Sequence, residues 1–226
     1  MLRGGVLTAA VCLWAVAELG GQPATGTITG HVTLTSKVRG VAMPSNVYQP
    51  RAVARRDSTA VPEIRNVVVS LKGVKAQGAL RPMHEEIRQE GEVFTPRVVT
   101  VTRGSTVDFP NDDPVFHNVF SLSSAAGFDL GRYPQGRTKS TTFSKSGIVK
   151  VYCHLHSQMS ATILVLDHPY FTTPDLDGAF TLTDVPPGTY QIAGWHERVG
   201  ERTVKVTVVA GKSTSIELSL PVEDPQ

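Results

Sequence analysis

Cysteine is scarce in this chain, with two among 226 residues, Cys12 and Cys153. Cys12 lies in an apolar N-terminal segment, so removal of that segment leaves Cys153 alone and excludes an internal disulfide. Beyond that segment the chain lacks long hydrophobic runs, so no membrane span is expected in the mature protein. The formal net charge is only +2, which gives no electrostatic basis for binding nucleic acid.

The first residues have the pattern of an export signal. Arg3 precedes an apolar run over residues 6–17, and Ala15-Val16-Ala17 supplies a small-x-small cleavage site before Glu18. The run is too short to span a bilayer comfortably. We therefore expect residues 1–17 to be a signal peptide and the mature protein to be periplasmic. Secretion, or a lipid anchor at Cys12, is the alternative.

The most informative segment runs from Cys153 to Met159 and has the spacing C-x₂-H-x₂-M. This spacing lets Cys153, His156 and Met159 turn toward one ion from a single loop, and His117 would close the site from another strand. One thiolate, two imidazoles and one thioether form the ligand set of a trigonal copper centre with a weak axial methionine. A lone exposed thiol in an oxidising compartment is a liability, which metal ligation resolves. Zinc is the chemical alternative, but the methionine favours copper.

A region of about ninety residues that includes Phe94 to Met159 resembles the blue-copper proteins, or cupredoxins, and its ligand loop is similar to that of the amicyanin and plastocyanin type. The resemblance is carried by Phe94-Thr95-Pro96, 98–101, 103–106 and 107–113 leading into His117-Asn118. It implies a Greek-key sandwich that holds one Cu(I)/Cu(II) ion through His117, Cys153, His156 and Met159. It also implies that the Asn118 side chain ties the His117 strand to the ligand loop. His156 is then expected to be the electron port.

Hydrophobic alternation predicts strands on both sides of this region, over 28–34 and 67–71 before it and over 175–182, 185–192, 204–208 and 216–220 after it. The two early strands cannot make a sheet alone. Asp-Gly and Pro-Pro-Gly turns separate the later strands, as in an antiparallel sandwich.

The motifs D-x-D-G-x-F-x-L from Asp175 and V-P-P-G-x-Y from Val185 resemble the transthyretin-like, carboxypeptidase-regulatory type of β-sandwich. In that resemblance both halves belong to one domain. We therefore predict an all-β fold in which a cupredoxin sandwich, residues 81–169, is inserted in a transthyretin-like sandwich of residues 18–80 and 170–226.

Alternation also predicts strands inside the inserted region, with Val99, Val101, Val107 and Phe109 facing its core, 148–152 running into the cysteine, and 159–166 closing the sheet. Residues 127–133 are interpreted as a structured loop beside the site. The proline-containing segment 37–65 is interpreted as a surface loop, and docking of its arginines onto an acidic partner or membrane surface is the alternative.

The remaining histidines are assigned ordinary roles. We expect His31, His84 and His168 to lie at the surface, and His154 to point away from the ion because successive strand side chains alternate. His196 follows Trp195, the only tryptophan beyond the signal, so packing between the domains is favoured over metal binding.

Two classes of function compete at this point. The favoured one is an electron carrier that exchanges single electrons with a redox partner protein and is not an enzyme. The alternative is a copper-binding interaction or copper-handling protein in which the metal is cargo or structural. A copper oxidase ranks third, because it would need further His-x-His pairs and this chain has only His154-Leu155-His156. A dinuclear electron-transfer copper site is excluded, because it needs two cysteines and only Cys153 remains beyond the signal.

Overall fold

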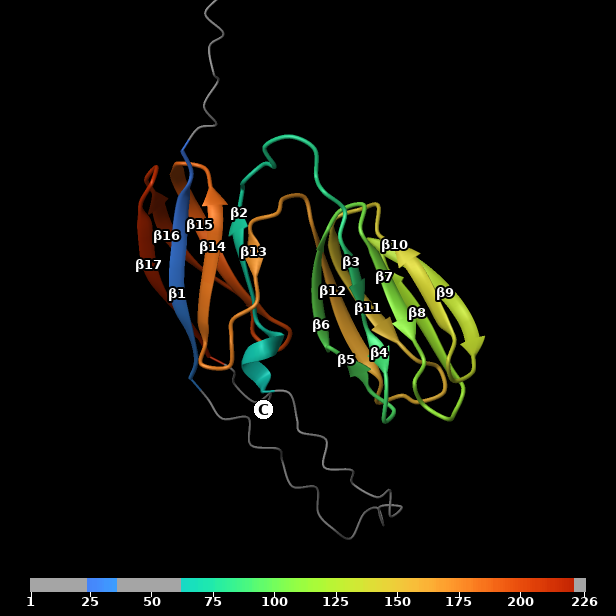
Figure 1. Ribbon diagram of the computed structural model, residues 1–226. Helices are drawn as coiled ribbons and strands as arrows, with labels where there is room; N and C mark the ends of the chain where they lie inside the picture. The colour runs from blue at the N-terminus through green and yellow to red at the C-terminus, as the bar shows by residue number, and fades with distance from the viewer. Residues whose placement is uncertain (1–23, 36–61, 222–226) are drawn as a thin grey trace, which may run out of the picture.

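The computed structural model describes residues 24–35 and 62–221, and in these ranges the chain is built from strands with one short 3-10 helix, η1 (Glu63–Asn66). The predicted all-β class is confirmed. The strands form two bodies that lie next to each other (Figure 1). The predicted signal peptide and most of the predicted 37–65 loop lie outside the described residues. No helix within the described ranges has the length and apolar character needed to cross a bilayer.

The first body combines the two earliest strands with the five latest. Its sheets have the orders β14-β1-β17 and β13-β2-β15-β16. The strands are β1 (Gly26–Leu34), β2 (Val68–Lys72), β13 (Phe171–Thr172), β14 (Ala179–Val185), β15 (Gly188–His196), β16 (Gly200–Val208) and β17 (Ser213–Leu220). Apolar side chains from both sheets, including Ile28, Leu71, Ile192 and Leu220, form one buried core. Strands thus occur where the flanking alternation predicts them.

Strand pairing joins the two ends of the described chain. β1 pairs antiparallel with β14 and parallel with β17, and β2 pairs antiparallel with β13 and β15. The Asp-Gly turn before β14 is built as its sequence indicates: Asp175 Oδ1 accepts hydrogen bonds from the N–H groups of Asp177 and Ala179, and Gly178 has a φ of 92°. The assignment of this body to a transthyretin-like domain stays a prediction, as do the domain boundaries.

The second body contains the intervening strands. A five-stranded sheet, β6-β12-β11-β8-β9, faces a three-stranded sheet, β10-β7-β3, and β4 pairs with β5 beside them. The strands are β3 (His84–Glu86), β4 (Arg88–Gln89), β5 (Phe94–Thr95), β6 (Val98–Thr102), β7 (Thr106–Pro110), β8 (His117–Ser123), β9 (Ala126–Tyr133), β10 (Thr138–Thr142), β11 (Gly147–Tyr152) and β12 (Ser160–Leu166). Val99, Val101, Val107 and Phe109 are buried between the sheets, as predicted.

The interpretation of residues 127–133 as a loop is wrong. They belong to β9, which forms an antiparallel hairpin with β8, with Ser123 paired to Ala126 at the turn and His117 paired to Tyr133 at the far end. The turn is so short that β9 must return directly along β8. Partner pairing therefore gives extended structure to a segment that contains two glycines, Gly127 and Gly131.

The outer face of the five-stranded sheet contacts the first body. Val98 and Leu164 pack on Val68 and Trp195 in a small separate apolar cluster. Beside it, Glu197 accepts a hydrogen bond from Lys150 and forms a 3.2 Å ion pair with Arg97. Apolar packing and these ion pairs together hold the two bodies against each other.

Candidate metal centre

The site lies where β8 begins and β11 ends. These strands are neighbours in the five-stranded sheet, with Tyr152 paired to Phe120. His117 is the first residue of β8, and Cys153 follows the last residue of β11. Past Cys153 the chain leaves the sheet and returns as β12, which lies on the other side of β11. The strand order therefore brings His117 and the ligand loop together.

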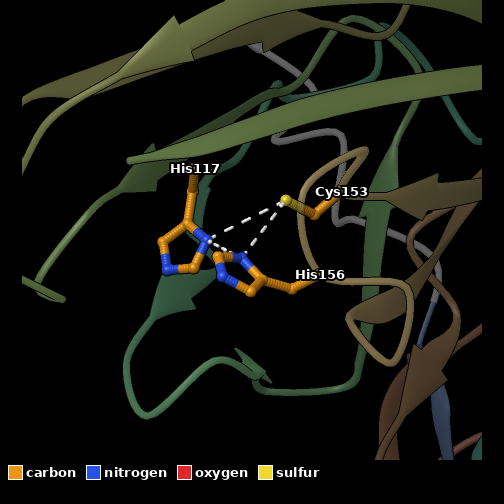
Figure 2. Close-up of side chains that lie close together, drawn as sticks. All are labelled: His117, Cys153 and His156. Atoms are coloured by element: carbon orange, nitrogen blue, oxygen red, sulfur yellow. Dashed lines mark hydrogen bonds between the residues drawn. The ribbon is translucent and has the colours of Figure 1, made fainter. Parts of the chain in front are cut away.

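Figure 2 shows the side chains of His117, Cys153 and His156 converging on one point. Cys153 Sγ lies 3.9 Å from His117 Nδ1 and 4.0 Å from His156 Nδ1, and the two Nδ1 atoms are 3.0 Å apart. In the part of the chain that the structure describes, this is the one group of three His, Cys, Asp or Glu donors whose atoms all lie within 4.8 Å of one another.

These separations fit a bound transition metal. Bonds of about 2.0–2.1 Å to imidazole nitrogen and about 2.3 Å to thiolate sulfur span donor separations of about 3 to 4 Å, the range seen between the three atoms. One thiolate and two imidazoles suit copper or zinc by ligand softness. Three of the four residues predicted as ligands therefore come together as donors around one point.

The fourth predicted ligand, Met159, closes the loop. It is 1% exposed and belongs to the same buried cluster as Cys153, and its N–H donates to the carbonyl oxygen of His156 at 3.0 Å. This bond closes a tight turn at the end of the ligand loop. A buried thioether here has the character required of a weak axial ligand, and that role stays a prediction.

Asn118 connects β8 to the ligand loop. Its Oδ1 accepts the backbone N–H of His154 at 3.2 Å, and its Nδ2 donates to Asp129 Oδ1 on β9 at 2.6 Å. Since His154 directly follows Cys153, the side chain fixes the start of the loop to the strand that carries His117. The bond to His154 is the contact that the family resemblance implies for Asn118, and the bond to Asp129 adds to it.

Asp113 is a partner of the site that the sequence analysis missed. Its Oδ2 lies 2.7 Å from His117 Nε2, the nitrogen that faces away from Cys153, and both side chains are almost completely buried. Burial by itself raises the pKa of the Asp113 carboxyl, but hydrogen bonds from Glu92, His117 and Gly91 outweigh it and lower the pKa below its ordinary value. The available signal in the sequence was the position of Asp113, four residues before His117.

His156 differs from the other donors because it reaches the surface. It is half-buried and lines a shallow depression with Val115, Phe116, Arg132 and Leu155. Phe116 is 56% exposed and Leu155 38%. The depression beside His156 therefore carries apolar side chains and one guanidinium group.

The other histidines serve structural contacts. His154 packs against Phe120 with ring centroids 3.7 Å apart and the rings tilted by 35°, outside the donor cluster. His196 is buried and bonds to Glu63 at 3.0 Å, so it fixes η1 to the end of β15. Its predicted packing between the bodies stays a prediction. The expectation that His168 lies at the surface is wrong, since its side chain is only 8% exposed. Its Nδ1 accepts the backbone N–H of Tyr170, which is buried where the chain re-enters the first body.

No protein-family model matches the chain, and neither does any curated protein sequence. Among solved structures, it is similar to a copper-containing nitrite reductase from Thermus scotoductus, with 24% identity and a TM-score of 0.36 over 41% of this chain and 24% of that one. A purple cupredoxin from Nitrosopumilus maritimus has 22% identity and a TM-score of 0.33 over 36% and 99% of the respective chains. Reduced amicyanin P94F has 21% identity and a TM-score of 0.35 over 37% and 82%.

This chain spans about a quarter of the length of the nitrite reductase. Because the three identities are below 25% and the TM-scores below 0.5, these similarities carry no argument about function.

Proposed function

We propose that this chain is an exported copper protein that carries single electrons between redox partner proteins and is not itself an enzyme. The observation that carries the proposal is the convergence of Cys153, His117 and His156, whose donor atoms are 3.0–4.0 Å apart. Two of these residues are buried and the third reaches the surface. Copper bound there would supply a one-electron Cu(II)/Cu(I) couple.

The residues have distinct tasks in this proposal. Cys153 and Met159 belong to the same buried cluster and exclude water from the inner side of the site. Asp113 bonds to Nε2 of His117, on the far side of the ring from Cys153, so the ring keeps Nδ1 directed at the thiolate. A scaffold that fixes its donors in this way lowers the rearrangement that accompanies electron transfer. His156 provides the path to the surface, where the apolar rim of Phe116 and Leu155 can exclude water from a docked partner.

The test is the visible spectrum of the purified mature protein on addition of Cu(II). We expect one copper per chain and an intense thiolate-to-Cu(II) charge-transfer band that bleaches on reduction. Cys153→Ser should abolish the band. His154→Asn is the matched control, because His154 adjoins the cysteine but packs against Phe120 outside the cluster.

A colourless one-to-one complex, or a band that survives Cys153→Ser, would exclude a copper centre ligated by the Cys153 thiolate. Rapid loss of copper to a weak chelator without a stable band would favour the copper-handling alternative. The proposed export is tested separately, since processing after Ala17 leaves Glu18 as the N-terminal residue of protein recovered from the periplasm.

A further inference from the structure

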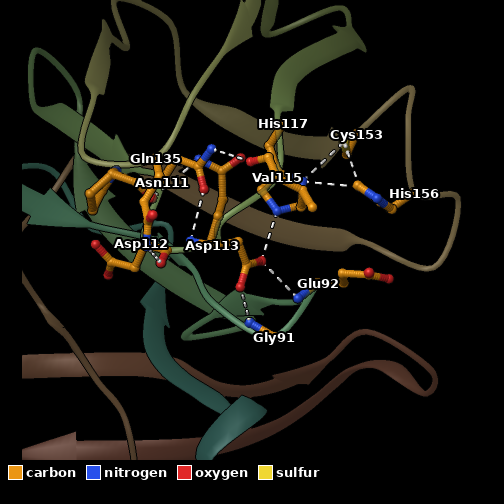
Figure 3. A network of polar contacts seen from close by, with 12 residues as sticks. Gly91, Glu92, Asn111, Asp112, Asp113, Val115, His117, Gln135, Cys153 and His156 are labelled. Atoms are coloured by element: carbon orange, nitrogen blue, oxygen red, sulfur yellow. Dashed lines mark hydrogen bonds and ion pairs between the residues drawn. The ribbon is translucent and has the colours of Figure 1, made fainter. Parts of the chain in front are cut away.

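A turn between β4 and β5 presents two backbone N–H groups to one buried carboxylate. Gly91 and Glu92 both have positive φ, 67° and 57°. Their N–H groups donate to Asp113, at 2.6 Å to Oδ1 from Gly91 and 2.9 Å to Oδ2 from Glu92 (Figure 3). Successive N–H groups in such a turn form a concavity that binds anions. A non-glycine residue such as Glu92 adopts this conformation uncommonly.

The carboxylate is also fixed from its own loop. Asp113 donates its backbone N–H to Asn111 Oδ1 at 3.0 Å, and Asn111 Nδ2 donates to the carbonyl oxygens of Val115 and Tyr133 at 2.9 and 3.1 Å. Figure 3 shows this network reaching from the turn to His117. Because Tyr133 is the β9 partner of His117, the loop from Asn111 to Val115 is anchored to the strand pair that carries the site.

The carboxylate in turn determines how His117 can act. An ionised carboxylate only accepts hydrogen bonds, so the 2.7 Å contact requires a proton on His117 Nε2. A neutral imidazole then has its lone pair on Nδ1, the atom that faces Cys153 and His156. Asp113 therefore selects the tautomer that can ligate a metal.

We propose that Asp113 is the positioning residue of this centre and that its buried negative charge lowers the reduction potential by favouring the oxidised site. The inference rests on the proposed copper function. Asp113 is 5% exposed, so water screens its charge poorly. Its other hydrogen-bond donors, the Gly91 and Glu92 N–H groups, carry no formal charge. The more positive oxidised form of the site gains more from this carboxylate than the reduced form does.

The test compares Asp113→Asn with Asp112→Asn in the full chain. Both substitutions remove one negative charge, from adjacent residues. Asp112 bonds to Arg88 at the surface and does not contact His117. We expect Asp113→Asn to keep copper and its band and to raise the Cu(I):Cu(II) ratio at fixed applied potential by about tenfold, equivalent to about 59 mV. The control variant, Asp112→Asn, should change the Cu(I):Cu(II) ratio much less.

A second measurement needs no variant. The His117 Nε2 proton should be visible by ¹H–¹⁵N NMR as slowly exchanging, both in metal-free protein and in the Cu(I) form. A fast-exchanging or absent Nε2 proton would overturn the positioning role, even if Asp113→Asn does not fold. Equal potentials for Asp113→Asn, Asp112→Asn and wild type would overturn the charge effect. Wild-type protein without a charge-transfer band would instead refute the underlying copper function.

Discussion

Replacement of Asn118 by alanine should loosen the ligand loop and also destabilise the second body. The alanine removes the acceptor for the His154 N–H and the donor to Asp129. A neutral hydrogen bond contributes about 1 kcal/mol, and one to a charged group somewhat more. Because Asp129 is exposed, solvent screening reduces its share. The expected loss in the free energy of unfolding is therefore about 2 kcal/mol.

Two assays measure this effect. Urea unfolding followed by circular dichroism reports the stability of the metal-free protein, and hydrogen exchange of the His154 amide reports opening of the loop. Copper release to a chelator should also become faster. Asn66→Ala is the matched control, since Asn66 is also buried but bonds to Glu63 in the first body. It should leave His154 exchange unchanged. A stability change below about 0.5 kcal/mol with unchanged exchange in Asn118→Ala would refute this account of the loop.

Three further predictions follow from the site and the contact between the bodies. Met159→Gln should retain copper and colour but shift the reduction potential, whereas His117→Ala should open the site and lose the band; equal copper loss in both would refute a weak axial bond. Burial raises the pKa of Glu197, but Lys150 and Arg97 outweigh it and lower the pKa below its ordinary value. Glu197→Gln should therefore be less stable than wild type near pH 7, and the difference should vanish as pH falls through the lowered pKa; a pH-independent difference in urea unfolding would refute this. A fragment of residues 81–169 should fold and bind copper, whereas 18–80 should not fold alone; a cooperative unfolding transition for 18–80 would refute the insertion.

The strands were predictable where one face of a sheet is buried. Alternation located β6 and β7 by their valines and phenylalanine, because period-two patterning follows directly from burial of one side. The same rule failed for β9, where Phe128, Leu130 and Tyr133 are interrupted by glycines and charges. Only pairing with β8 makes that segment extended, and a hairpin partner is a tertiary contact that the segment itself does not encode.

The loop from Cys153 to Met159 could be singled out from the sequence because three of the four predicted ligands lie within seven residues. The surroundings of the site were not, because they depend on residues distant in sequence. Gly91 and Asp113 are separated by 22 positions, and their contact exists only because β4 lies beside β7 in the fold. Glu63 and His196 are separated by 133 positions. Contacts of this kind require the complete chain topology before the side chains can meet.

The contact between the bodies bears on how a partner could use the centre. Lys150, which bonds to Glu197 of the first body, precedes Cys153 by three residues, about 10 Å of extended strand. Leu164 of β12 packs on Trp195, and β12 begins directly after the ligand loop. Two neighbouring strands thus connect the site to the first body through regular hydrogen-bonded structure, without a flexible linker between them. A partner bound to the first body would therefore meet the His156 face in one fixed direction. If the 81–169 fragment keeps its spectrum and potential but exchanges electrons more slowly with the native partner, docking is the function of the first body.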